Sequence, residues 1–391
     1  MKIVDVSAFY APDGGGVKTY VEQKIRALAA RGHELVIVAA SDRDAIEPRG
    51  PGCRIVHLSS PAMPLDRRYR YFAEAGPVHA VLDAERPDFV EASSPWRTAS
   101  IVAGWQGAAP RALVMHADPL AAYAYRWFGP IAERATIDRH FQWFWNHLRR
   151  NARRFDRVVC ANHGLAARLS AGGVAHVATV PLGIDAGIFS PSHRDEELRA
   201  DLLARCGLGA GARLLLGIGR HSAEKRWPMV IDACQRAGLK RPIGLVLVGG
   251  GRDTARIRRH IGGNPHVHLL APVRDRALLA RVMASADALI HGCEAETYGL
   301  AAAEAAASGL PLIVPSEGGA ADLVLPGHGE HFRPASRRSA AAAIDRLLAR
   351  DIDGLHAATR ADAGRIATID DHFDRLIADY AHLSAAARIV A

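Results

Sequence analysis

Short apolar runs alternate with longer helical patterns along the first half of the chain. Between the first two apolar runs, Val21, Ile25 and Leu28 recur at helical spacing, and Gly32 then ends the pattern. Strands that alternate with helices in this way indicate a mostly parallel sheet that helices cover on both faces. The strands predicted in this half are residues 2–6, 34–39, 54–58, 89–92, 112–116, 157–161 and 178–181.

The same alternation starts again after residue 185. A helix is predicted from Trp227 to Ala237, and the chain from about residue 337 is rich in alanine with a helical pattern. The strands predicted in this half are residues 213–217, 243–248, 266–270, 288–291 and 312–314.

Two α/β units therefore follow each other in a chain of 391 residues, a length that suits two domains of ordinary size. We expect an N-terminal Rossmann-like domain over residues 1–185 and a C-terminal one over residues 186–369. A linker is expected near residues 181–191. The last helix, residues 370–391, is expected to pack back on the N-terminal domain.

The composition is that of a globular protein, with 49% hydrophobic and 23% charged residues, which argues against disorder. A formal charge of +8 suits nucleotides, phospholipid surfaces or nucleic acid without choosing among them. The five cysteines show no C-x-x-C spacing, so we expect reduced structural thiols. No signal-peptide pattern or run of membrane-spanning length is visible, so we expect a cytoplasmic location, with contact at the inner face of a membrane left open.

The segment over residues 294–311 carries the most chemical information. Gly299 permits a tight turn into an alanine-rich helix, whose N-terminus is a ready site for a phosphate. Glu304 lies about one turn inside that helix, where its carboxylate can accept hydrogen bonds from the vicinal hydroxyls of a ribose. Glu296 precedes the turn, with seven residues between it and Glu304. The alternative is an alanine-rich packing helix that carries two solvated glutamates.

Two further loops follow predicted strands. Arg220 and Lys225 flank a polar loop, where two cations can stabilise a diphosphate leaving group. A dinucleotide fingerprint fails there, because its third glycine position holds Ser222. The glycines at 14–16 follow the first strand and let backbone approach a ligand, although no Walker sequence is present. A solvated loop and a simple turn are the respective alternatives.

Taken together and in this order, these segments resemble the retaining glycosyltransferases of family 4. The matching elements are E-x7-E over 296–304, G-R-x4-K over 219–225, the glycines at 14–16 and the linker PLGIDAGIFSP over 181–191. The resemblance implies the GT-B fold, an α/β architecture of two Rossmann-like domains with a donor cleft between them. It implies a retaining hexosyltransferase that uses a UDP- or GDP-sugar and a glycan or lipid-linked acceptor. A DxD metal motif in a single-domain context, which would indicate the other transferase fold, is not part of this pattern, so neither a catalytic metal nor a cofactor is expected.

The resemblance implies a role for each matched residue on the donor side. Arg220 and Lys225 would bind the donor diphosphate, and Glu304 would hold the ribose. Val273 would contact the nucleobase largely through its backbone. Gly15 and Gly16, from the N-terminal loop, would approach the donor phosphate or the acceptor. The full set of residues expected to bind the donor is Gly15, Gly16, Arg220, Lys225, Val273, Glu296, Tyr298, Gly299, Leu300 and Glu304.

A second group of residues would contact the transferred sugar. Glu296 would bind its hydroxyls, with the backbone N–H groups of Tyr298, Gly299 and Leu300 nearby, and His116 would lie beside the sugar. A packing histidine is the alternative for His116. The residues expected to act in catalysis are Glu296, His116, Arg220 and Lys225.

Two positions depart from the family pattern. Arg226 stands where the family usually has glycine, which leaves the shape of the loop open, and Asp322 replaces glutamate in the later Gly-Gly-x-x-Glu element. Neither position belongs to the E-x7-E pair.

The stretch over residues 123–157 combines six aromatic residues that include Trp127, Trp143 and Trp145 with arginines at 149, 150, 153, 154 and 157. Such a combination suits an interfacial helix on anionic lipid. A packed amphipathic helix with a solvated basic face is the alternative.

Two other functions share some of these features. A sugar-nucleotide epimerase or hydrolase on a similar fold would keep the donor site and need no acceptor. A nucleic-acid-binding protein would suit the basic charge, but no RNA-binding aromatic motif or helix-turn-helix is visible, so no nucleic acid is expected. The donor base, the sugar and the acceptor are not specified by these motifs.

Overall fold

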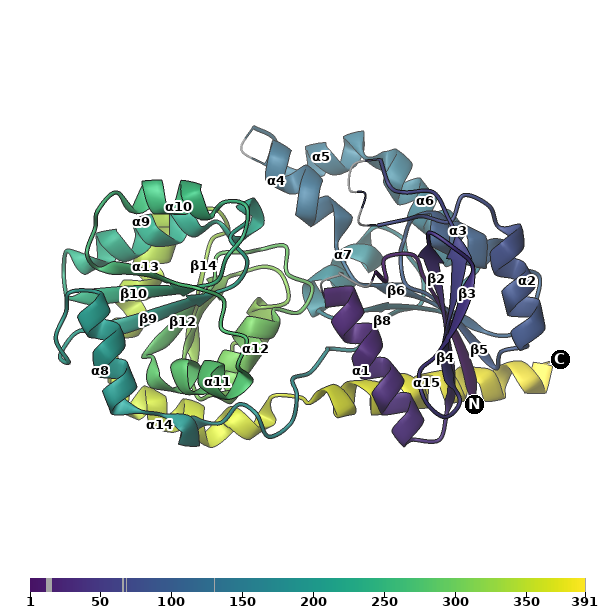
Figure 1. Cartoon of the computed structure of the whole chain (residues 1–391). Helices are drawn as coiled ribbons and strands as arrows, with labels where there is room; N and C mark the ends of the chain where they lie inside the picture. Colours follow the sequence, from purple (N-terminus) through teal and green to yellow (C-terminus); the bar gives the residue numbers. More distant parts are fainter. Residues whose placement is uncertain (12–15, 65–66, 68, 130, 391) are drawn as a thin grey trace. The chain divides into compact units, whose positions relative to one another are not determined.

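A computed structural model describes residues 1–11, 16–64, 67, 69–129 and 131–390. The chain divides into two compact units (Figure 1). The first unit comprises Met1–Asp118, Trp127–Pro181 and Ile369–Ala391, and the second comprises Pro119–Arg126 and Leu182–Thr368. The last helix, α15 (Ile369–Val390), thus groups with the first unit although it lies at the other end of the sequence.

The first unit contains an eight-stranded sheet in the order β3-β4-β2-β1-β5-β6-β7-β8. Its neighbouring strands are parallel except for β3 and β4. The strands are β1 (Lys2–Ser7), β2 (Glu34–Ser41), β3 (Ala45–Pro48), β4 (Cys53–Ser59), β5 (Phe89–Ala92), β6 (Arg111–Met115), β7 (Arg157–Cys160) and β8 (Val177–Thr179). The helices are α1 (Gly16–Ala30), α2 (Gly76–Glu85), α3 (Arg97–Gly104), α5 (Arg134–His140), α6 (Gln142–Ala152) and α7 (His163–Ala171).

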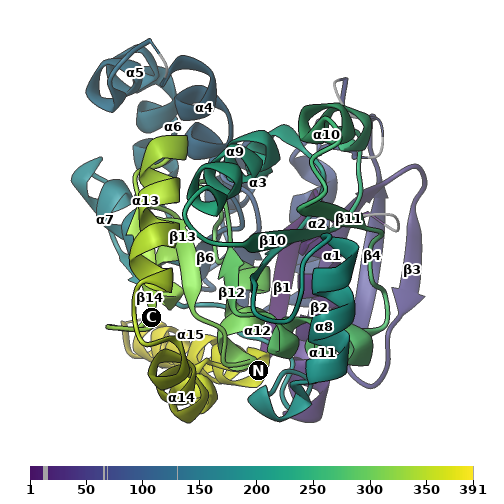
Figure 2. The same cartoon turned by 90° about the vertical axis from the view of Figure 1, so that its left-hand side faces the viewer.

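The predicted strands of this half are all present. The central strands β1, β2 and β5 are almost wholly buried, as expected of a sheet that helices cover on both faces. Sequence reasoning missed the antiparallel strand β3, which Figure 2 shows at the outer edge of the sheet beside β4. All four residues of β3 are exposed, so the strand has no apolar alternation that could reveal it.

Between β6 and α5 the chain forms a π-helical turn, Leu120–Ala124, and the short helix α4 (Tyr125–Phe128). The boundary between the two units runs through α4.

The second unit contains a six-stranded parallel sheet in the order β11-β10-β9-β12-β13-β14. In Figure 1, α9, α10 and α13 lie above this sheet and α8, α11 and α12 lie below it. The strands are β9 (Arg213–Ile218), β10 (Ile243–Val248), β11 (Val267–Leu270), β12 (Ala288–Ile290), β13 (Leu312–Pro315) and β14 (Gly329–Phe332). The helices are α8 (Glu196–Arg205), α9 (Trp227–Gly238), α10 (Thr254–Ile261), α11 (Arg276–Ser285), α12 (Leu300–Ala307), α13 (Arg337–Leu348) and α14 (Ile352–Asp362).

Strand order reverses direction in the second sheet between β9 and β12. From β9 the chain adds β10 and β11 on one side, and it then returns to add β12, β13 and β14 on the other side. A crevice opens outside the carboxyl ends of the strands at such a switch point, and ligands of doubly wound sheets bind there. The loops that follow β9 and β12 are therefore the first place to look for a site in this unit.

The last helix is held to the first unit by ion pairs and stacking. On α15, Asp374 accepts from Arg31 Nε at 2.6 Å, and Asp379 accepts from Arg157 Nε at 2.8 Å. The ring of Tyr380 stacks on Phe89 with centroids 3.9 Å apart. Arg157, one of the arginines in the basic aromatic stretch, thus has a structural partner.

No helix in the described part of the chain is both long enough and apolar enough to cross a bilayer. All five cysteines lie within the described ranges, where each is a buried thiol outside any disulfide.

Candidate functional site

The loops after β9 and β12 meet through an ion pair. Lys225, in the 3₁₀ turn Ala223–Lys225, donates from Nζ to the carboxylate of Glu296, and His291 Nε2 lies 3.4 Å from the same oxygen. Burial by itself raises the pKa of Glu296, but the contacts with His291 and Lys225 outweigh it and hold that pKa well below its usual range. Burial lowers the pKa of Lys225, and the Glu296 charge more than offsets that, so the net pKa is raised. Both groups are therefore ionised at neutral pH.

A second ion pair lies beside the first. The guanidinium of Arg226 donates to both carboxylate oxygens of Glu294, with Nε 2.8 and 3.1 Å from them. Arg226 has φ +51°, in the left-handed region that glycine adopts without strain. The residue that departs from the family pattern thus keeps a backbone shape that suits glycine, and it adds a charge.

A third loop, which follows β13, packs against the backbone at Glu296. Gly319 donates its N–H to the carbonyl of Glu296 at 2.7 Å. A Cβ on Gly319 would lie 2.4 Å from the carbonyl oxygen of Thr297 and from Cα of Tyr298. Only glycine allows the two backbones to approach this closely, which explains the Gly318-Gly319 element in physical terms. The second departure, Asp322, lies just beyond it in the 3₁₀ turn Ala321–Leu323.

Glu304 is buried inside α12, the helix that begins after Gly299, which has φ +89°. Arg276 Nη2 lies 2.7 Å from Glu304 Oε1 and 3.4 Å from Asp185, and its guanidinium sits 4.7 Å over the ring of Phe189. Burial raises the pKa of Glu304 even though Arg276 opposes that shift. Sequence reasoning missed Arg276, because 28 positions separate it from Glu304 and no motif spacing joins them.

Arg220 lies in the same loop as Lys225, but the environment of its side chain is different. Its side chain is 79% exposed and lies 3.6 Å from Glu224, and its carbonyl accepts a hydrogen bond from Trp227 Nε1 at 2.9 Å. The backbone just before it is fixed, because a Cβ on Gly249 would lie 2.0 Å from the Gly219 carbonyl oxygen. The exposed guanidinium of Arg220 is accessible to an anion that arrives from solvent.

Three other residues of the second unit are predicted to bind the donor, namely Val273, Tyr298 and Leu300. Val273 is half-buried between β11 and α11. Tyr298 is buried, and burial raises the pKa of its hydroxyl to about 12. Leu300 is the first residue of α12, so its N–H belongs to the helix N-terminus that follows Gly299.

His116 and Gly16 belong to the first unit. His116 follows β6, and its ring packs edge-on against Tyr20 with centroids 4.8 Å apart. Burial lowers the pKa of His116 to about 4, so the ring is neutral near pH 7. Gly16 is the first residue of α1, whereas Gly15 lies outside the described residues.

A buried charge cluster that sequence reasoning missed lies in the first unit. Lys24 on α1 is fully buried and donates to Asp5 on β1, at 2.9 Å, and to Glu91 on β5. Ser93 adds a hydrogen bond of 2.7 Å to Asp5. One signal was available, because Lys24 shares the apolar face of α1 with Tyr20 and Leu28, where a lysine needs a buried partner.

Helix α15 adds His372 to the surroundings of Tyr20. His372 Nδ1 lies 2.9 Å from the Pro181 carbonyl oxygen, which can only accept, so Nδ1 carries the proton. Burial lowers the pKa of His372 to about 4, so the ring is neutral and its Nε2 accepts from the Tyr20 hydroxyl at 3.0 Å. The C-terminal helix thereby orients Tyr20, which packs against His116.

One group among the described residues could gather around a metal ion. His291, Cys293 and Glu296 offer ligand atoms that all lie within 4.8 Å of one another. However, Glu296 already has the ammonium of Lys225 as its cation, and burial raises the pKa of the Cys293 thiol to about 12. A metal ion at this group would have to compete with Lys225 for the carboxylate of Glu296 and to displace the proton of the Cys293 thiol.

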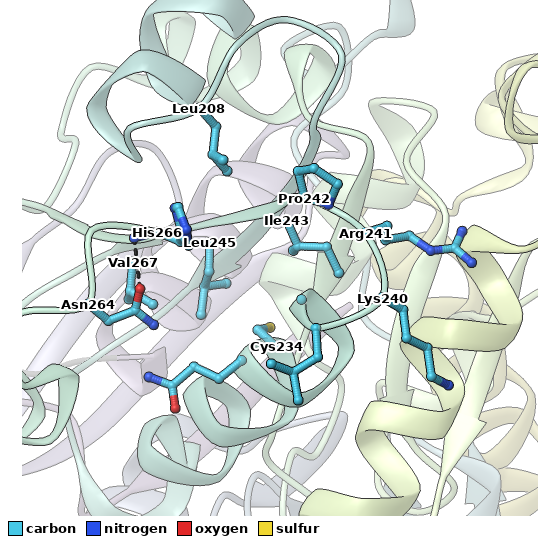
Figure 3. Close-up of a pocket in the computed structure, with 13 residues that line it drawn as sticks. Leu208, Cys234, Lys240, Arg241, Pro242, Ile243, Leu245, Asn264, His266 and Val267 are labelled. Carbon is cyan, nitrogen blue, oxygen red and sulfur yellow. Dashed lines mark hydrogen bonds between the residues drawn. The ribbon is translucent and has the colours of Figure 1, made fainter.

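A cavity of about 630 Å³ lies elsewhere in the second unit (Figure 3). It includes Ile243 and Val267, the first residues of β10 and β11, and so lies at the amino ends of these strands. Two of its polar groups are already engaged, since Lys240 pairs with Asp345 at 2.6 Å and His266 Nδ1 donates to a carbonyl at 2.9 Å. Lys225 and Glu296 follow the carboxyl ends of their strands, so this cavity lies at the other end of the sheet.

Comparison with known proteins decides the family. Residues 14–187 match the sequence model of Glycosyltransferase Family 4, and residues 204–366 match that of Glycosyl transferases group 1. A GDP-mannose-dependent alpha-(1-6)-phosphatidylinositol dimannoside mannosyltransferase from Mycobacterium tuberculosis is 30% identical over 80% of this chain and 79% of its own length. This chain belongs to glycosyltransferase family 4. A GDP-mannose-dependent alpha-mannosyltransferase from the same species is 28% identical over 83% of this chain and 82% of its own.

Solved structures agree on the fold of this family 4 glycosyltransferase. Sucrose-phosphate synthase from Thermosynechococcus elongatus superposes with a TM-score of 0.74 and 22% identity, covering 99% of this chain and 100% of the other. The Anabaena protein HepE, in complex with UDP, gives 0.70 and 16%, covering 98% and 100%. The expected GT-B fold is confirmed, and the protein is a glycosyltransferase that uses a nucleotide sugar.

The backbone contact behind Glu296 can be tested by adding one methyl group. Gly319→Ala should lower the free energy of unfolding by about 1 to 3 kcal/mol, because its Cβ meets backbone that has nowhere to move. Gly238→Ala is the matched control, since a Cβ at Gly238, in the last position of α9, meets nothing within 4 Å. It should leave stability unchanged or raise it by up to about 1 kcal/mol. Denaturant unfolding measures both, and equal effects would show that the contact is not tight.

Proposed function

We propose that this family 4 enzyme transfers a mannosyl group from GDP-mannose, with retention of configuration, to a glycan or lipid-linked acceptor. The observation that carries the proposal is the arrangement at the switch point of the second sheet. Lys225 and Glu296 are largely buried and ionised in the loops after β9 and β12, and Glu304 is buried inside the helix that follows. The donor and sugar come from the relatives, several of which are named GDP-mannose-dependent mannosyltransferases.

The charges suit a diphosphate leaving group. Arg220 is exposed and free to move toward an anion, while Lys225 is fixed by its ion pair with Glu296. Negative charge grows on the diphosphate as the glycosidic bond breaks, and preorganised cations stabilise that growth. We propose that both side chains contact the diphosphate, and that Val273 meets the base through its backbone.

The two glutamates suit different parts of the donor. Glu296 lies before the turn, and we propose that it holds hydroxyls of the transferred sugar, with the N–H groups of Tyr298, Gly299 and Leu300. Glu304 lies inside α12, and we propose that it accepts hydrogen bonds from the ribose, whose hydroxyls compete there with Arg276.

His116 supports a role that does not need a charge. Its low pKa, about 4, leaves a neutral imidazole that can donate one hydrogen bond to a sugar hydroxyl. A phosphate oxygen of the donor is then the proposed base for the acceptor, so no side chain acts as a covalent nucleophile and no metal is required. Gly16, at the start of α1, is proposed to approach the donor phosphate or the acceptor.

The donor and the stereochemistry are tested together. Purified enzyme is screened with GDP-mannose, UDP-glucose and ADP-glucose for ligand-induced thermal stabilisation, and we expect the largest shift with GDP-mannose. Proton NMR of fresh product should show the α-anomer, which is the anomer of the donor. A β-product would contradict the retaining mechanism. Rapid donor consumption without any acceptor would favour the hydrolase or epimerase alternative instead.

The division of labour between the glutamates is tested by nucleotide binding. Glu304→Gln should weaken GDP binding by roughly 10- to 100-fold, because a charge-assisted hydrogen bond of about 1.5 to 3 kcal/mol to the ribose is lost. Glu296→Gln should leave GDP affinity nearly unchanged, because GDP carries no transferred sugar, but it should lower kcat with the full donor. Calorimetry and steady-state kinetics measure the two effects. The reverse pattern would show that the two roles are exchanged.

A surface of the first unit suits a lipid-linked acceptor. Trp127 and Trp143 are 60% and 58% exposed, and Phe141 joins Phe128 to Trp143 with ring centroids 6.3 and 6.2 Å apart. Arg150, Arg153 and Arg154 are exposed near by in the sequence. Arg149 does not belong to this set, because it holds the Gly172 carbonyl at 2.8 Å. We propose that these exposed aromatic and basic side chains contact anionic lipid.

Vesicle sedimentation tests the lipid contact. Each basic side chain near an anionic surface contributes about 1 kcal/mol, so Arg153→Gln with Arg154→Gln should weaken binding to phosphatidylserine vesicles by roughly 10- to 30-fold at low salt. Arg337→Gln with Arg338→Gln, on α13 of the second unit, changes the net charge equally and should have little effect. Equal losses in both pairs would indicate attraction by net charge alone.

A further inference from the structure

We propose that Arg226 and Glu294 are positioning residues. Their mutual ion pair keeps the ammonium of Lys225 paired with Glu296 alone. The proposal rests on the proposed function of Lys225 and Glu296 in donor binding. Neither Arg226 nor Glu294 needs to touch the donor, and Arg226 stands where the family pattern usually has glycine.

The two ion pairs form a ladder between two loops. Lys225 and Arg226 are consecutive, whereas Glu294 and Glu296 are two residues apart, and each cation pairs with its own carboxylate. The loops touch through their backbones as well, because a Cβ on Gly292 would lie 2.6 Å from the Lys225 carbonyl oxygen. A change at either pair is therefore felt at the other.

The charges of both pairs act on the same small region. The thiol of Cys293, which lies between the two carboxylates in the sequence, has its pKa shifted by Glu296, Lys225 and Glu294 together, after burial as the largest cause. The Arg226 and Glu294 side chains are mostly buried, so their interaction is only weakly screened by solvent.

Balance of charge explains why the second pair matters. Two cations face two carboxylates, so each lysine or arginine charge is matched. Without Arg226, the carboxylate of Glu294 would remain in a largely buried place without that partner, and the residue next to Arg226 in the sequence is the cation Lys225. Glu294 would then compete with Glu296 for the Lys225 ammonium. The guanidinium of Arg226 prevents that competition, because it donates from two nitrogens to both oxygens of Glu294.

The backbone at Arg226 makes the proposal easy to test. At φ +51° and ψ 35°, this position accommodates glycine at least as well as arginine. Arg226→Gly therefore removes the guanidinium without strain in the loop that precedes α9. Glu294→Gln removes the charge of the partner while keeping its size.

The experiment is a double-mutant cycle read by kinetics. Arg226→Gly, Glu294→Gln and the double variant are compared with the wild type for kcat and KM with GDP-mannose, and for GDP affinity by calorimetry. Arg226→Gly alone should lower kcat/KM by about tenfold or more, and the double variant should recover to within about threefold of the wild type. The recovery is the decisive result, because the second substitution removes the carboxylate that competes for Lys225.

A matched ion pair controls for a loss of stability. Arg199 and Asp287 form a similarly buried two-nitrogen pair, with distances of 2.8 and 3.2 Å, next to the amino end of β12. Arg199→Ala should lower the melting temperature yet leave kcat and KM unchanged well below that temperature.

Two results would overturn the proposal: wild-type kinetics in Arg226→Gly, or a double variant no faster than Arg226→Gly. Failure of the wild type to bind GDP would instead overturn the proposed function, and the same calorimetry shows it before any variant is compared.

Discussion

The contact between Lys225 and Glu296 is the constraint on which the second unit depends. Its two residues come from the carboxyl ends of β9 and β12, the strands between which the sheet order reverses. Because both side chains are largely buried, each charge is tolerable only with the other present. The backbone approaches closely on both sides of this ion pair. Gly319 contacts the loop that carries Glu296, and Gly292 contacts the carbonyl of Lys225. Small residues let three loops approach, and the opposite charges then hold the approach in register.

The first unit solves a similar problem in a different way. Its strand order also reverses, between β1 and β5, and these two strands carry the buried carboxylates Asp5 and Glu91. Lys24 from α1 neutralises both carboxylates, so these charges are paired inside the unit without any ligand. The ring of His116 is neutral beside this cluster, and α15 completes it through His372 and Tyr20. The C-terminal helix is thereby tied to the interior of a unit whose sheet was formed by the opposite end of the chain.

Sequence patterns predicted the elements whose signal is local. Most strands of the two sheets are apolar runs, and the E-x7-E spacing lies within one loop and one helix, so these could be found without a structure. The edge strand β14, with the sequence Gly-Glu-His-Phe, was missed because it is not an apolar run. The exposed strand β3 has no apolar pattern, and its only signal is its pairing with β4. Partnerships between distant positions were also invisible, as between Arg276 and Glu304 or between Arg157 and Asp379. Arg226 was noticed as a departure, but its partner Glu294 could be identified only from the fold.

Burial raises the pKa of both glutamates, and the partners of Glu296 outweigh that shift whereas the partner of Glu304 does not. Glu296 has a lowered pKa, so its ionised form stabilises the fold above the unfolded pKa, and that contribution is lost as the pH falls. Glu304 has a raised pKa, so its ionisation opposes folding, and the penalty grows as the pH rises above the unfolded value. A carboxylate of the first kind has its electrostatic partners in place before any ligand arrives. At Glu304, the contact with Arg276 does not fully offset the cost of burial, and a ligand that brings hydroxyl donors to this carboxylate would relieve part of that cost.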